Sequence, residues 1–142
     1  MLDIILFIFF VIILIGIGKG FIAVIQLKAG YAKDITFIHI DGIPNFDKGN
    51  EINLSFTPDE IKIGDSFKIS IDNVIGMDVT KTKENGIGYL LKIHFIGKDN
   101  QEKKEIFLRV KSYNAGASVI EISKQVNKRK NYIPHEQQIV EL

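Results

Sequence analysis

Hydrophobic and polar positions divide the chain into two unequal parts. Of residues 1–32, 24 are hydrophobic, against 41 of the 110 residues that follow. The apolar run from Ile4 to Gly18 has 15 residues, which as a helix reach roughly 22 Å, short of a hydrocarbon core about 30 Å thick. Continued through Lys19 to Ile25, the segment has 22 residues and reaches roughly 33 Å. The pattern therefore predicts a transmembrane helix over residues 1–27, with the ammonium of Lys19 extended to the far interface.

A secretory signal peptide is the competing interpretation of this segment. Signal peptides begin with a basic region, but Asp3 is the only charge before the apolar run. The small residues Ala29 and Ala32 also make a poor cleavage site. We therefore favour a single uncleaved span, through which the protein contacts the lipid bilayer of the cell membrane.

The charges that flank the span predict its orientation. Lys19, Lys28 and Lys33 lie on the C-terminal side of the apolar run, and only Asp3 lies on the other side. Lysine is enriched on the cytoplasmic side of membrane spans. We therefore expect the remainder of the chain to lie in the cytoplasm.

From Ile35 onward the apolar residues recur mostly at every second position, which is typical of β-strands. Residues 35–43 are apolar on both faces, as expected of a well-buried strand, and the later runs alternate as one-faced strands of an antiparallel meander. Asn85-Gly86 is the strongest hairpin signal between them. Seven strands are predicted, over residues 35–43, 52–57, 61–63, 67–72, 74–82, 87–95 and 106–110. Four aromatic residues on these strands are expected in the core: Phe56, Phe67, Phe95 and Phe107.

The hydrophobic period changes after Ser112, which is a suitable N-cap residue. Apolar residues spaced by 4, 3 and 4 positions then form one stripe of an amphipathic helix: Ala115, Val119, Ile122 and Val126. Asn131 and Pro134 end this helix. The predicted organisation is a transmembrane helix (1–27), a juxtamembrane linker (28–34), a β domain closed by the helix (35–130) and a polar C-terminal tail (131–142).

Composition narrows the classes of function. The net charge is +1, and in residues 33–142 the 16 basic and 16 acidic side chains cancel, which disfavours nucleic-acid binding. The absence of cysteine excludes disulfides, thiolate metal sites and a cysteine nucleophile. His39 and His94 could meet across a sheet, but they lack metal-ligand spacing and are better explained as ordinary strand residues. No catalytic motif is present. The sequence therefore predicts a protein that is not an enzyme and binds no metal or cofactor.

The order of elements resembles the pleckstrin-homology superfold. Residues 39–44 (HIDGIP), 52–57 (INLSFT) and 67–72 (FKISID) are similar to segments of small bacterial pleckstrin-homology-like and GRAM-like domains. The resemblance covers about residues 35–127. It implies a split barrel of two roughly orthogonal sheets, one open end of which is filled by the C-terminal helix. It also implies a domain that binds lipids or proteins and is not a catalyst.

The best-known ligand of this superfold is not expected here. Members that bind phosphoinositides resemble one another in a basic cluster on the first two strands and their loop. In this chain the same stretch carries Asp41, Asp47, Lys48 and Glu51, and no arginine. Such a loop repels an inositol phosphate, which needs several Lys or Arg side chains to match its charge.

Two classes of function remain open from the sequence. The first is a membrane-anchored interaction module that recruits or organises a protein partner at the cytoplasmic membrane face. The alternative is a domain that senses lipid headgroups or the envelope by direct contact. Basic residues at the C-terminal end of a helix are also expected without any ligand, because they complement the negative end of the helix dipole. The candidate contact residues for either function are basic: Lys28, Lys33, Lys124, Lys128, Arg129 and Lys130.

Overall fold

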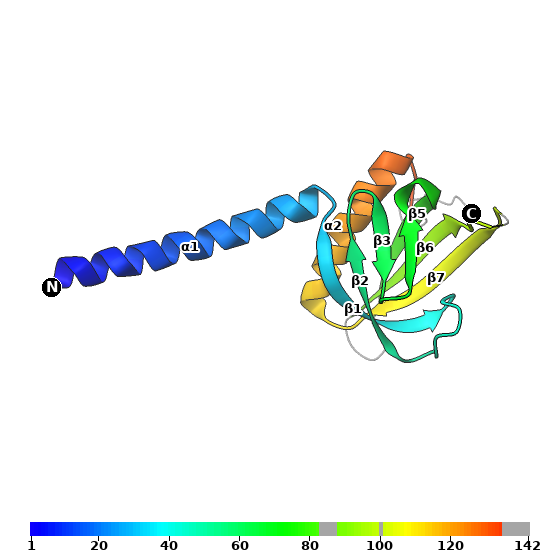
Figure 1. Cartoon of the computed structure of the whole chain (residues 1–142), viewed down its shortest axis with the longest axis horizontal. Helices are drawn as coiled ribbons and strands as arrows, with labels where there is room; N and C mark the ends of the chain where they lie inside the picture. The colour runs from blue at the N-terminus through cyan, green and yellow to red at the C-terminus, as the bar shows by residue number, and fades with distance from the viewer. Residues whose placement is uncertain (83–87, 100, 135–142) are drawn as a thin grey trace, which may run out of the picture.

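The structure is a computed structural model that describes residues 1–82, 88–99 and 101–134 (Figure 1). Within these residues the chain forms a long N-terminal helix, seven strands, a short 3₁₀-helix and a C-terminal helix. The elements are α1 (Leu2–Lys28), β1 (Ala32–Asp41), β2 (Glu51–Phe56), β3 (Glu60–Ile63), β4 (Phe67–Ser70), η1 (Ile71–Asn73), β5 (Val74–Thr82), β6 (Gly88–Ile96), β7 (Lys103–Val110) and α2 (Tyr113–Lys130). The predicted mainly β class is confirmed, as are the C-terminal helix and the apolar N-terminal helix.

The seven strands form one antiparallel sheet in the order β4-β3-β2-β1-β7-β6-β5. β4 and β5 are its two edges, so the sheet is not closed. β1 joins the two halves, because its first part pairs with β2 and its last part with β7. A bulge near the start of β1 contains Asp34 (φ 51°), whose backbone N–H donates to the Ser55 hydroxyl. Bulges of this kind bend a strand, so β1 can serve both halves of the curved sheet.

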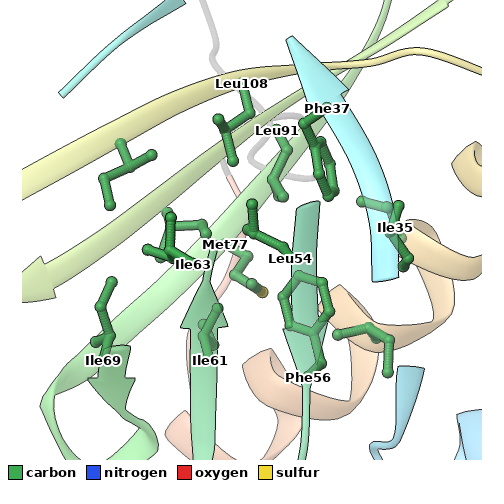
Figure 2. Close-up of a cluster of buried hydrophobic side chains, with 14 of the residues drawn as sticks. Ile35, Phe37, Leu54, Phe56, Ile61, Ile63, Ile69, Met77, Leu91 and Leu108 are labelled. Carbon is green, nitrogen blue, oxygen red and sulfur yellow. The ribbon is translucent and has the colours of Figure 1, made fainter. Parts of the chain in front are cut away.

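The core lies between the inner face of the sheet and α2. Alternate residues of the strands point into it, and Figure 2 shows Phe37, Leu54, Ile63 and Leu91 converging from four different strands. From α2, the predicted stripe contributes Val119, Ile122 and Val126, all buried. Burial of each such large apolar side chain contributes about 1.5–3 kcal/mol.

The prediction for residues 35–43 is wrong in one respect. Ile35 and Phe37 are buried, but Ile38 and Ile40, which alternate with them, are only half-buried on the outer face. β1 therefore has one buried face, and it spans Ala32–Asp41. It ends before Gly42, where φ is +99° and an added Cβ would meet the Glu105 carbonyl oxygen, so only glycine fits this position.

The predicted strand over residues 67–72 is also wrong at its end. β4 stops at Ser70, and residues 71–73 form η1, with the Ile71 N–H donating to the Asp59 carbonyl at 2.9 Å. In a 3₁₀-helix the side chains at positions i and i+3 point the same way. Ile71 and Val74 therefore both enter the core as the chain turns from β4 to β5. The other described strands begin and end within three residues of their predicted bounds.

Two of the four aromatic residues expected in the core lie elsewhere. Phe56 is buried and Phe95 packs partly against the core, as predicted. Phe67 is 37% exposed on the edge strand β4. Phe107 lies on the outer face of β7 beneath the Lys92 ammonium, 5.4 Å from its ring centroid, because it is one residue out of phase with the buried Ile106 and Leu108. The predicted Asn85-Gly86 hairpin and residues 135–142 of the predicted tail lie outside the described residues.

Side-chain and backbone caps fix both ends of α2. The predicted N-cap is confirmed, because the Ser112 hydroxyl accepts a hydrogen bond from the Ala115 N–H at 3.2 Å. At the other end, Asn131 adopts the left-handed conformation (φ 51°). The Tyr132 N–H then donates to the Asn127 carbonyl at 2.9 Å, which is the six-residue bond of a Schellman motif. Tyr132 is thereby turned back toward the sheet.

Candidate functional site

The C-terminal end of α1 is fixed by its own backbone. The Gly30 N–H donates to the Leu27 carbonyl at 3.0 Å, and the Tyr31 N–H donates to the Gln26 carbonyl at 2.8 Å. These two bonds, with Gly30 in the left-handed region (φ 93°), make a Schellman motif. Only residues 29–31 separate α1 from β1, whereas the sequence predicted a linker over residues 28–34.

This end of α1 is packed against two other parts of the domain. Leu27 packs against the core, and α1 contacts α2. Gly30 is buried, and a Cβ added to it would lie 3.5 Å from Nη2 of Arg129 and 3.7 Å from Cγ of Pro58. The Nη1 group of Arg129 donates a hydrogen bond to the Pro58 carbonyl at 2.9 Å. We call this region the junction surface and define it as Lys28, Gly30, Tyr31, Pro58 and Arg129.

The structure divides the six basic residues that were singled out from the sequence. Lys28 and Arg129 both belong to the junction surface, with exposed side chains. Lys124 lines a groove with Lys81 and Tyr89. It is five residues before Arg129, which places it on the opposite side of α2 at 3.6 residues per turn.

The other three basic residues are also spread out. Lys33 lies in a depression that is also lined by Lys62 and by three acidic residues, Asp34, Glu51 and Asp65, so the acidic side chains offset the basic ones. Lys128 is exposed and Lys130 half-buried at the C-terminal end of α2. The six residues therefore do not form one continuous patch, and the junction surface is the part that lies beside α1.

A polar cluster that the sequence did not predict lies on the outer face of β5, β6 and β7. His94 Nε2 lies 2.6 Å from the Asp78 carboxylate, and His94 Nδ1 lies 3.2 Å from the Glu105 carboxylate. The Tyr132 hydroxyl donates to the same Asp78 oxygen at 2.9 Å. We call these four residues the His94 cluster. It connects β5, β6 and β7 to Tyr132, the second residue after the end of α2.

The chemistry of the His94 cluster follows from its hydrogen bonds. Asp78 is only 8% exposed, and donors from His94 and Tyr132 compensate for the burial of its carboxylate. Burial raises the pKa of Tyr132 well above its ordinary value, and the hydrogen bond to Asp78 and the charges of Asp78 and Glu105 raise that pKa further. Tyr132 therefore remains a neutral donor at physiological pH.

His39 does not meet His94, because the two rings lie on opposite faces of the sheet. His39 is buried between β1 and the following loop, where its Nε2 accepts from the Ile43 N–H at 3.0 Å. Its Nδ1 lies 3.3 Å from the Asp47 carbonyl. These contacts make His39 an organiser of the loop after β1. Among the residues that the structure describes, no group of three His, Cys, Asp or Glu side chains is arranged to hold a metal ion.

Comparison of the chain with known proteins identified no related protein. No family model matches the chain, and no curated protein matches it. The similarity to the pleckstrin-homology superfold therefore stays a prediction from the sequence.

Proposed function

We propose that this protein is a single-pass membrane-anchored interaction module, which recruits or organises a protein partner at the cytoplasmic face of the cell membrane. The observation that carries the proposal is the exposure of α1. Its segment Leu2–Lys19 is long and apolar enough to cross a membrane, and none of it is buried against the rest of the protein. Apolar helices of this size are stable where hydrocarbon surrounds them.

The junction between α1 and the domain supports an organising role. The Schellman motif, Leu27 and the contact with α2 hold the domain in one orientation relative to the helix. Figure 1 shows α1 extending away from the domain as a continuous helix, with β6 and β7 on the far side. A bilayer around α1 would therefore fix which faces of the domain point toward the cytoplasm.

The outer face of β5, β6 and β7 is the surface that we assign to the partner. It carries half-buried apolar residues, Leu90 and Phe107, beside Lys92 and the His94 cluster. A depression of about 270 Å³ on this face is lined by Asp78, Thr80, Leu90, Lys92, His94, Glu105 and Phe107. Aromatic residues such as Phe107 are enriched in protein interfaces. Both ring nitrogens of His94 lie against carboxylates, which supports a structural rather than a catalytic use of this histidine.

Site-specific photo-crosslinking of the full-length protein in its native membrane tests the proposal. A photoreactive residue at Phe107 is expected to capture one protein, which mass spectrometry then identifies after solubilisation in mild detergent. The matched control is Lys48, which is exposed in the loop after β1. Equal capture from both positions, or capture from neither, would contradict a partner on this face.

A further inference from the structure

We propose that the junction surface docks onto the phospholipid headgroups of the bilayer that holds α1, with the Arg129 guanidinium as a ligand of lipid phosphate. This inference rests on the proposed membrane span of α1. It adds a lipid-binding surface to the proposed protein-recruiting role, and it places that surface far from the acidic loop after β1.

The length of α1 determines the depth of the junction surface. A hydrocarbon core about 30 Å thick takes roughly 20 helical residues, and the headgroup layer on each side adds about 5–7 Å. The apolar segment of α1 ends at Ile25. Lys28 follows three residues later, or about 5 Å further along the helix axis. The end of α1 and the residues packed against it therefore lie within the headgroup layer.

Arg129 is suited to bind a phosphate at that depth. Its side chain is exposed, and the hydrogen bond from Nη1 to the Pro58 carbonyl holds the guanidinium beside Gly30. A guanidinium has five N–H donors in a planar fork that matches phosphate oxygens. The Pro58 carbonyl orients the group while donors remain for the lipid.

The neighbours of Arg129 also fit a headgroup layer. Tyr31 is 49% exposed beside the end of α1, and tyrosine is enriched at membrane–water interfaces. Lys28 and Lys128 add positive charge to that of Arg129, against two carboxylates in the adjoining turn, the exposed Asp59 and the half-buried Glu60. The net positive charge favours anionic lipids, by an amount that falls as ionic strength rises.

Fluorescence quenching of the full-length protein in liposomes tests this docking. The chain has no cysteine, so one introduced cysteine carries the fluorophore at a defined position. Asp59→Cys labels the turn next to Pro58, and Lys48→Cys labels the loop at the opposite end of β1. The quencher is a spin-labelled headgroup, in liposomes of phosphatidylcholine with or without phosphatidylglycerol.

We expect strong quenching at position 59, weak quenching at position 48, and an increase at position 59 when phosphatidylglycerol is present. Arg129→Gln should lower the docking equilibrium about five-fold, the effect of one basic side chain at an anionic surface. Lys124→Gln removes the same charge from the opposite side of α2 and should leave quenching unchanged. Lys28→Gln gives a second test, independent of the Pro58 contact.

The contrary outcomes separate this inference from the proposed function. Equal quenching at positions 59 and 48, or equal effects of Arg129→Gln and Lys124→Gln, overturns headgroup docking while the membrane span stands. If the protein does not float with liposomes at all, the span fails and the docking fails with it.

Discussion

Asn127 and Met77 form a reciprocal pair of hydrogen bonds although 50 residues separate them in the chain. The Asn127 side-chain oxygen accepts from the Met77 N–H at 2.8 Å, and its amide nitrogen donates to the Met77 carbonyl at 2.9 Å. Met77 lies on β5, an edge strand whose outward backbone groups are open to pairing with other chains. One side chain of α2 therefore satisfies part of this edge and fixes the register of the helix on the sheet.

Replacement of Asn127 by Ala should destabilise the domain by about 2–4 kcal/mol, because two buried backbone groups of Met77 lose their partners. The measurement is urea denaturation of the full-length protein in detergent, followed by circular dichroism. Lys124→Ala on the exposed side of the same helix is the control and should change stability by less than about 0.5 kcal/mol. Similar effects of the two substitutions would contradict this role of Asn127.

Tyr132→Phe should alter the dependence of stability on alkaline pH. The pKa of Tyr132 is raised in the folded protein, chiefly by burial and then by Asp78, so the folded chain keeps a proton that the unfolded chain loses above pH of about 10. The contribution of the protonated Tyr132 to the free energy of unfolding is therefore complete below pH of about 10. It declines as pH rises further, by up to about 1.4 kcal/mol per pH unit. The stability advantage of the wild type over Tyr132→Phe should shrink over that range in denaturation curves. Parallel pH profiles for the two proteins would be incompatible with the raised pKa.

Gly76→Ala should move Tyr132 away from Asp78. A Cβ at position 76 would lie 2.2 Å from the Tyr132 ring, and the collision should cost about 1–3 kcal/mol. In a Tyr132→Ala background the space is open, so the same substitution should cost much less. A double-mutant cycle from denaturation curves measures this difference. Additive effects would show that the ring and Gly76 are not coupled.

Gly30→Ala should loosen the connection between α1 and the domain. The substitution forces a residue with a Cβ into the left-handed region, at a cost of about 1–2 kcal/mol, beside Arg129 and Pro58. Spin labels on introduced cysteines at Val11 and Lys48 should then give a broader distance distribution in double electron–electron resonance. Gly18→Ala, which has open space around it in α1, is the control. An unchanged distribution in Gly30→Ala would argue against a rigid junction.

Local features of the fold could be predicted because the signals for them lie close together in the chain. The N-cap role of Ser112 and the burial of the stripe that includes Val119 and Ile122 could be predicted, because both depend on spacings within one helix. The end of β4 was missed for the same local reason. Ile71 continues the alternation of Phe67 and Ile69, whereas the hydrogen bond from the Ile71 N–H to the Asp59 carbonyl joins residues 12 positions apart and leaves no local signal in the sequence.

The His94 cluster could not be predicted in full. The strand period contains part of the signal, because His39 is in phase with the buried Phe37 whereas His94 is out of phase with the buried Leu91 and Ile93. That phase places the two histidines on opposite faces. The contact of His94 with Asp78 depends on the register of β5 and β6, and that of Tyr132 depends on the turn at Asn131, neither of which is encoded in a short spacing.

The three-residue connection between α1 and β1 limits where encounters can take place. A domain on a long tether samples a volume of cytoplasm, and its effective concentration toward a partner depends on tether length. Because only residues 29–31 connect α1 to β1, this domain can move very little relative to the end of α1. If α1 anchors the domain, the domain would meet a protein partner by lateral diffusion in the plane of the membrane. Such a partner would need a complementary surface at the same distance from the bilayer as the domain.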